Sequence, residues 1–203
     1  MRFLLLMVFG LTSFHAAADT PAEEGSKIRY FSEVVTFEKG SSVMSEEQLN
    51  DLRIVADYAK SSGKVLQVKI AAWPDVPYAE GKSILFKQPD IVLANARAYE
   101  IREALLQQIR PVFIKIINMA KEADWLDRML DSEENQLKEA LISHDNDQIG
   151  KLSEDMQMIY RKGDASTAVA ILKIDTGARE EEEETDTSSP IEVFPFDYYG
   201  IKL

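Results

Sequence analysis

The 203-residue sequence contains no cysteine and only two histidines. Without cysteine there is no disulfide, no thiol chemistry and no lipid carried on a cysteine side chain. A zinc site takes three or four nitrogen, sulfur or carboxylate ligands at close spacing, and His144 is the one histidine outside the N-terminal segment. The sequence therefore argues against a metal site, and we expect no cofactor.

Other signatures of catalysis are missing as well. The sequence has no G-x-S-x-G turn for a nucleophilic serine and no glycine-rich loop of the kind that cradles phosphate. Carboxylates are abundant enough for a paired-carboxylate glycosidase, but no two of them stand out at strand ends. We therefore expect a protein that is not an enzyme.

Positive charge is scarce. Lysine and arginine number 23 against 35 aspartates and glutamates, which gives a net charge of −12. A protein this acidic repels phosphate backbones, so nucleic acid is not an expected partner. Long apolar runs are missing too, and we expect no direct membrane span, because such a helix needs about 20 apolar residues.

The N-terminal segment has the order of a secretory signal peptide. Arg2 precedes an apolar run at 3–11, and three alanines follow at 16–18. We expect cleavage after Ala18 and export of residues 19–203; a permanent N-terminal anchor is the alternative. Residues 19–27 are polar and are expected to be flexible.

The following residues predict alternating strands and helices. Strands are expected at 28–37, 64–73, 110–120 and 167–175, where β-branched and apolar residues dominate. Ser45 and Gln48 form a capping box for a helix that ends near 62, before Gly63. Asp90 can cap a second helix that ends near 108. The crossover rule favours parallel pairing of neighbouring strands.

An acidic helical segment is expected at 121–162. Its apolar stripe should contribute to the core, and it consists of Trp125, Leu126, Met129, Leu130, Leu137 and Leu141. Residues 176–190 include a glutamate run and are expected to be a disordered linker. Residues 191–203, "IEVFPFDYYGIKL", form an apolar tail that either packs back on the domain or adds a strand to a partner.

One pair of charges suggests a binding site. Asp75 directly follows the second strand, and Arg97 lies about two turns into the helix opened by Asp90. In open α/β layers strand ends and helix starts face one crevice, so both charges could reach one small ligand. Arginine would hold a carboxylate and aspartate an ammonium, which suits a zwitterion. A plain structural salt bridge is the alternative.

The helix and the preceding strand end resemble the OmpA-like peptidoglycan-binding domain family. That family has a helix of pattern N-x-x-L-S-x-x-R-A-x-x-V-x-x-x-L, and residues 90–105, "DIVLANARAYEIREAL", match its leucine, arginine, alanine, aliphatic and final leucine positions. The strand end "AAWPD" at 71–75 stands where the family has a glycine, an aromatic residue or histidine, threonine and aspartate. The similarity extends over residues 28–175.

This resemblance implies a fold, a ligand and a location. The fold is an α/β (α+β) sandwich with the order β-α-β-α-β-(helical insert)-β, a mixed sheet with helices on one face. Asp75 and Arg97 would bind the diaminopimelate of the peptidoglycan stem peptide, and Asp90 and Trp73 belong to the same candidate site. Trp73 would either stack over the ligand or fill the sheet edge. If Asp75 and Arg97 only bind a ligand at the surface, either can be removed without loss of the fold.

The implied protein is exported to the periplasm and associates with the cell wall or the outer membrane. It would tether an envelope complex, such as a secretion system, to peptidoglycan, with the tail at 191–203 reaching the partner. Four positions depart from the family pattern, namely Ala72 for glycine, Pro74 for threonine, Asp90 for asparagine and Ala94 for serine. A degenerate domain that acts as a subunit of such a complex without binding peptidoglycan is therefore the alternative.

Overall fold

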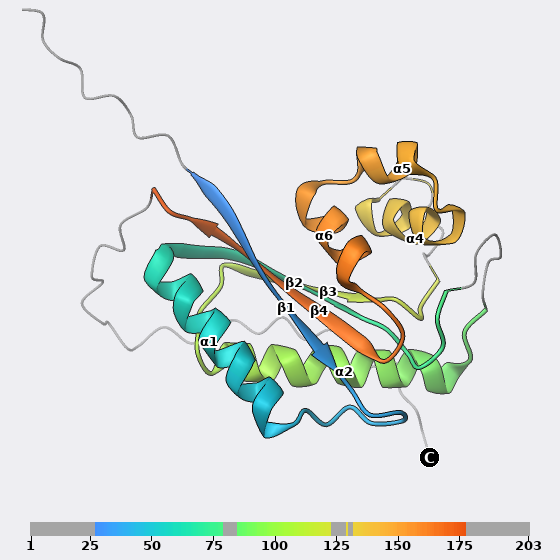
Figure 1. The fold of residues 1–203 in the computed structure, drawn as a ribbon, viewed down its shortest axis with the longest axis horizontal. Helices are drawn as coiled ribbons and strands as arrows, with labels where there is room; N and C mark the ends of the chain where they lie inside the picture. The colour runs from blue at the N-terminus through green and yellow to red at the C-terminus, as the bar shows by residue number, and fades with distance from the viewer. Residues whose placement is uncertain (1–26, 79–84, 123–128, 130–131, 178–203) are drawn as a thin grey trace, which may run out of the picture.

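A computed structural model describes residues 27–78, 85–122, 129 and 132–177 of the chain (Figure 1). Its strands are β1 (Ile28–Thr36), β2 (Lys64–Ala72), β3 (Phe113–Asn118) and β4 (Thr167–Asp175). All the expected strands are present. β3 is shorter than the expected 110–120, because Pro111 near its start cannot donate to a strand ladder. The expectations for the signal peptide, the flexible segment, most of the linker and the tail lie outside the described residues.

The four strands form one mixed sheet in the order β1-β4-β2-β3. β2 and β3 are parallel neighbours, as the crossover rule predicts. β1 and β2 are not neighbours, however, because β4 lies between them and runs antiparallel to both. Seven of the nine residues of β4, "TAVAILKID", are buried, and a strand that is apolar on both faces belongs in the centre of a sheet.

Two long helices cover one face of this sheet. They are α1 (Glu46–Ser62) and α2 (Gln88–Leu106), and their buried residues share a core with the inward residues of β2 and β4. The predicted capping box of Ser45 and Gln48 is present at the start of α1. Gly63 follows α1 with φ of +152°, and a Cβ there would lie 2.3 Å from the carbonyl oxygen of Asp175. Glycine is therefore required where α1 turns into β2.

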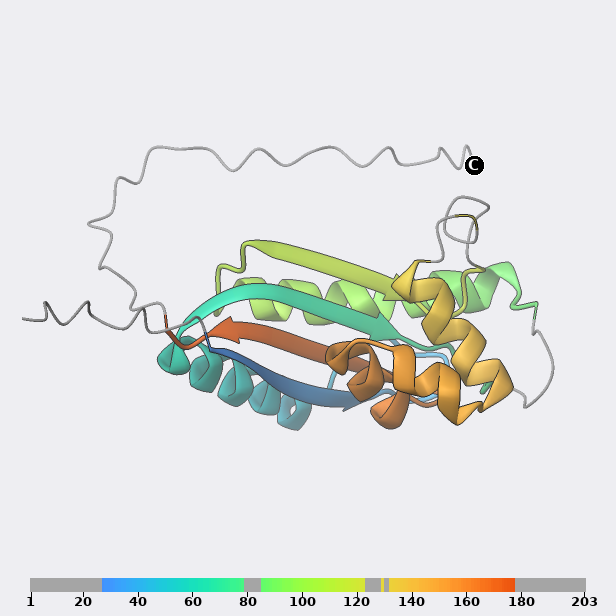
Figure 2. The same ribbon diagram turned by 90° about the horizontal axis from the view of Figure 1, so that it is seen from above.

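The acidic helical segment covers the opposite face (Figure 2). Its described helices are α4 (Glu133–Ser143), α5 (Asn146–Lys151) and α6 (Glu154–Lys162), and we call them the insert. The expectation that helices pack on one face of the sheet is thus correct for α1 and α2 but not for the insert. The residues of β2, β3 and β4 on the other face are apolar and must be covered as well. Of the expected stripe, Leu137 and Leu141 are buried and Met129 is 65% exposed, while Trp125, Leu126 and Leu130 lie outside the described residues.

The start of α2 differs from the expectation in one detail. Asp90 was expected to cap this helix, but α2 begins at Gln88 and Lys87 holds the capping position. Pro89 is the reason, since proline is favoured in the first turn of a helix. Asp90 instead accepts a hydrogen bond from the backbone N–H of Lys87 at 3.0 Å. None of the described helices is long and apolar enough to cross a bilayer.

Candidate functional site

The structure brings Asp75 and Arg97 together. Asp75 follows the carboxyl end of β2, Arg97 lies in the third turn of α2, and their side chains form a salt bridge with 2.5 Å between Nη2 and Oδ1. The two residues are separated by 22 positions in the sequence. The strand end and the helix therefore bring both charges together, as expected, in direct contact with each other.

Arg97 is enclosed by backbone oxygens as well. Its Nε donates to the carbonyl of Ser41 at 2.9 Å, Nη1 to that of Trp73 at 2.8 Å and Nη2 to that of Glu38 at 3.3 Å. The Phe37 ring lies under the guanidinium, 5.1 Å from centroid to Cζ. The side chain has 0% exposure. Arg97 thus fastens the segment 38–41 after β1 to the end of β2.

Asp75 is the accessible member of the pair, with 13% of its side chain exposed. Besides Arg97, it accepts hydrogen bonds from the Ser166 hydroxyl at 2.8 Å and from the backbone N–H of Gly40 at 2.6 Å. Burial raises the pKa of Asp75, but these hydrogen bonds lower it by more, so the pKa lies below its ordinary value. Gly40 has φ of +73°, a backbone conformation that glycine adopts at little cost.

Ser166 was not identified from the sequence. It lies in the turn between α6 and β4 and has φ of +61°, which is uncommon for a residue other than glycine. Its backbone N–H donates to the carbonyl of Pro74 and its own carbonyl accepts from Phe37, so it connects the ends of β1 and β2. No local sequence signal indicates this role, because Ser166 reaches Asp75 across 91 positions.

The other two candidate residues do not place side chains in this cluster. Trp73 is 1% exposed and its ring packs in the core under the insert, which is the packing interpretation of this residue. Only its carbonyl contacts Arg97. Asp90 accepts from Lys87 at the start of α2 and so fixes the first turn of the helix that carries Arg97. Within the described ranges, no three acidic or histidine side chains gather as a metal site would require.

No family model and no curated protein matches the sequence. Among solved structures, the chain is similar to the OmpA-like domain of FopA1 from Francisella tularensis, with 8% identity, a TM-score of 0.40, and coverage of 73% of this chain and 75% of that one. It is also similar to the periplasmic domain of Helicobacter pylori MotB, with 14% identity, a TM-score of 0.37, and coverage of 69% and 70%. The first of these structures bears the name of the family that residues 90–105 resemble.

Proposed function

We propose that this chain is a non-catalytic, periplasmic peptidoglycan-binding module that holds a partner or an envelope complex at the cell wall. Diaminopimelate of the stem peptide is the proposed ligand, and Asp75 and Arg97 are its proposed binding residues. The observation that carries this proposal is the direct contact of these two residues. The strand end marks Asp75, the helix pattern marks Arg97, and the fold brings them together from separate elements.

The roles of the two residues follow from their exposure. The partly exposed carboxylate of Asp75 would accept hydrogen bonds from the ligand ammonium, and its low pKa keeps it charged at neutral pH. Arg97 would meet the ligand carboxylate only after the segment 38–41 moves, because the carbonyls of Glu38 and Ser41 occupy its donors. A carboxylate is a stronger acceptor for the guanidinium than a backbone carbonyl is, because its negative charge adds to the attraction of the hydrogen bond.

A second function is favoured by the enclosure of Arg97. Its 0% exposure and its four internal hydrogen bonds are those of a structural salt bridge. In that case the chain would be a degenerate domain that serves an envelope complex, such as a secretion system, through protein contacts alone. Recovery of the same envelope proteins after digestion of the wall would support this second function.

The deciding experiment is sedimentation of residues 19–203 with purified sacculi that contain diaminopimelate. Asp75→Asn keeps the shape of the side chain and removes its charge, and we expect it to reduce the affinity for sacculi about tenfold, the effect of one hydrogen bond to a charged group. Glu100→Gln is the matched control, because Glu100 is an exposed carboxylate on α2. Circular dichroism must show that each variant is folded.

Sacculi with lysine in place of diaminopimelate provide a second control, since lysine lacks the additional carboxylate proposed to bind Arg97. We expect weaker sedimentation with the lysine form. If the folded wild type sediments with neither kind of wall, peptidoglycan binding is excluded and the second function stands.

A further inference from the structure

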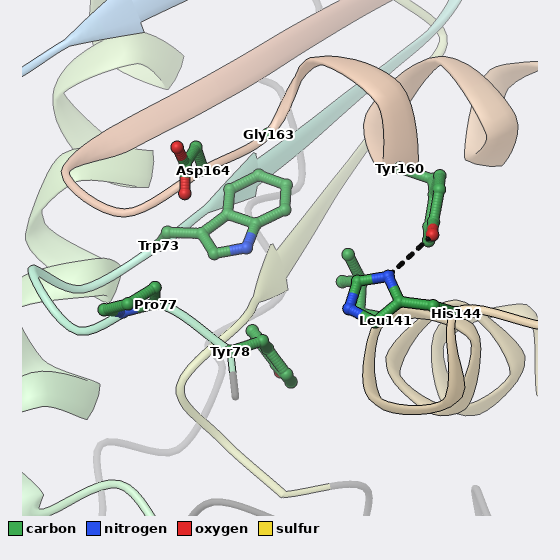
Figure 3. A pocket seen from close by; sticks show the side chains of 8 residues that line it. All are labelled: Trp73, Pro77, Tyr78, Leu141, His144, Tyr160, Gly163 and Asp164. Atoms are coloured by element: carbon green, nitrogen blue, oxygen red, sulfur yellow. Dashed lines mark hydrogen bonds between the residues drawn. The ribbon is translucent and has the colours of Figure 1, made fainter. Parts of the chain in front are cut away.

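A hollow of about 200 Å³ lies between the β2–α2 connection and the insert. Figure 3 shows the rings of Trp73, Tyr78, Tyr160 and His144 arranged around it, with Asp164 at its edge. It is separate from the salt bridge of Asp75 and Arg97, because Trp73 turns its ring toward the insert while its carbonyl faces Arg97. The peptidoglycan proposal makes no use of it.

The rings are held in place by contacts of their own. The Tyr78 hydroxyl donates to the carbonyl of Met119 at 2.5 Å, and Nδ1 of His144 lies 3.1 Å from the Tyr160 hydroxyl. Trp73 forms the floor, since it is 1% exposed and Gly163 packs directly against it. A Cβ at Gly163 would lie 1.9 Å from Cη2 of the indole, so glycine is required for this floor. The hollow is therefore preformed.

The charge around the hollow has one sign. Of the residues that line it in the described part of the chain, none is a lysine or arginine, and Asp164 contributes a carboxylate. Oδ1 of Asp164 accepts from the backbone N–H of Ala165 at 2.7 Å, and among the described residues Oδ2 has no donor. Burial raises the pKa of Tyr78, and the negative charge of Glu134 raises it further. Glu134 is paired with Lys138, so Asp164 supplies the negative charge at the hollow itself.

Aromatic faces and a nearby carboxylate are the groups that recognise an organic cation, because the face of each ring is negative. We propose that this hollow binds a small organic ammonium group, with the rings of Tyr78 and Tyr160 beside the cation, the buried Trp73 beneath them and Asp164 as its counter-ion. A neutral sugar would stack on one ring and donate its hydroxyls to the carboxylate, so N-acetylglucosamine is tested as the competing ligand, whereas a phosphate would be repelled by the carboxylate. The volume accommodates a group of the size of trimethylammonium.

The test is a titration of residues 19–203 with choline, followed by ¹H–¹⁵N NMR. The reporter is the indole N–H of Trp73, which a Trp125→Phe variant distinguishes from the other tryptophan. We expect saturable shifts of this resonance and of the amides of 163–164. Asp164→Asn retains the acceptor for Ala165 and should weaken choline binding about fivefold, a loss in the range of cation–aromatic and charge contacts.

Two controls make the result specific. Tyr160→Phe keeps the ring and should keep binding, whereas Tyr160→Leu removes the ring and should lose it. Tyr58→Leu removes an exposed ring on α1, far from the hollow, and should change nothing. The proposal is overturned if choline gives no saturable shift in the folded wild type, or if N-acetylglucosamine shifts the same resonances while choline does not.

Discussion

At the scale of single residues, Arg97 has a structural role whatever it binds. A guanidinium with 0% exposure remains in the interior only because each contact compensates for lost water, and the contacts of Arg97 join three segments of the chain. Removing it would leave the carbonyl of Trp73 buried without a donor. This enclosure argues against the expectation that the side chain can be deleted without harm to the fold.

We predict that Arg97→Ala lowers the free energy of unfolding by about 3–5 kcal/mol, the cost of breaking a buried pair by removing one partner. Arg102→Ala on the same helix is the control, because Arg102 is 34% exposed and, within the described part of the chain, its one ion pair is with its neighbour Glu103. The control should stay within about 0.5 kcal/mol of the wild type. Urea unfolding measures both, and a loss below about 1 kcal/mol for Arg97→Ala would contradict the structural role.

Sequence reasoning identified Asp75 and Arg97 because a local helix pattern and a strand end mark them. It did not identify Glu38, Ser41 or Ser166, since these residues reach the pair through backbone oxygens or across long sequence distances. Any residue type could supply the two carbonyls, so the identities of the side chains at these positions do not indicate the contact. The enclosure of Arg97 by backbone oxygens therefore could not be predicted from the sequence.

At the scale of elements, the insert is attached to the sheet by charge as well as by apolar contacts. Lys69 of β2 is buried under the insert and pairs with Asp155 of α6 at 2.6 Å and with Glu133 of α4 at 3.0 Å. Burial lowers the pKa of Lys69, but its hydrogen bonds to Asp155 and Glu133 outweigh burial, so the pKa lies above its ordinary value. For Asp155, burial raises the pKa and the bonds from Lys69 and Ser153 lower it by more.

The directions of the pKa shifts of Asp155 and Lys69 determine how the free energy of unfolding depends on pH. The contribution of Asp155 is complete above its unfolded pKa of about 3.9 and is lost as the pH falls through its lower folded pKa. The contribution of Lys69 is complete below about 10.4 and is lost as the pH rises through its higher folded pKa. We predict a plateau in the free energy of unfolding between about pH 5 and 9, with a decline on both sides.

The double variant Lys69→Met with Asp155→Leu isolates this pair, because Asp75 and the tyrosines remain in both proteins. It should show smaller declines at both ends and a stability at pH 7 equal to or above that of the wild type, since apolar replacements of buried pairs are often neutral or stabilising. Lys69→Met alone should lose about 3–5 kcal/mol at pH 7. If the free energy of unfolding of the double variant depended on pH as that of the wild type does, the pair of Lys69 and Asp155 would not be the source of the declines.

Elements were predictable where the signal is local. The capping box at Ser45 and the β-branched run in β1 are complete within a few residues, and both elements formed as expected. The order of the strands was not predictable from neighbouring elements, because the position of β4 depends on its pairing with β1, more than a hundred residues earlier. The opposite face for the insert was not predictable either, because it depends on apolar residues of β2, β3 and β4 that only the assembled sheet brings together.

At the scale of the whole molecule, the first and last described strands close the fold. β1 and β4 pair along their full length, from Ile28 opposite Asp175 to Thr36 opposite Thr167. Beyond this ladder, the backbone N–H and the hydroxyl of Thr176 both donate to the carbonyl of Lys27. Together these contacts suggest that residues 28–175, with their immediate neighbours, form a complete folding unit.

We therefore predict that a fragment of residues 27–177 unfolds with the same free energy as residues 19–203, within about 1 kcal/mol, because every pairing of β1 and β4 is retained. A fragment of residues 30–173 is the matched control. It lacks Ile174, which is fully buried, and should lose at least the roughly 1.5–3 kcal/mol that burial of such a side chain contributes. Denaturant unfolding of the three proteins measures both differences.

If the 27–177 fragment lost more than about 2 kcal/mol, residues outside the unit would have to pack on it. The tail at 191–203 would then be the first segment to truncate, since its apolar residues could supply that packing, whereas equal stability would leave the tail available for a partner.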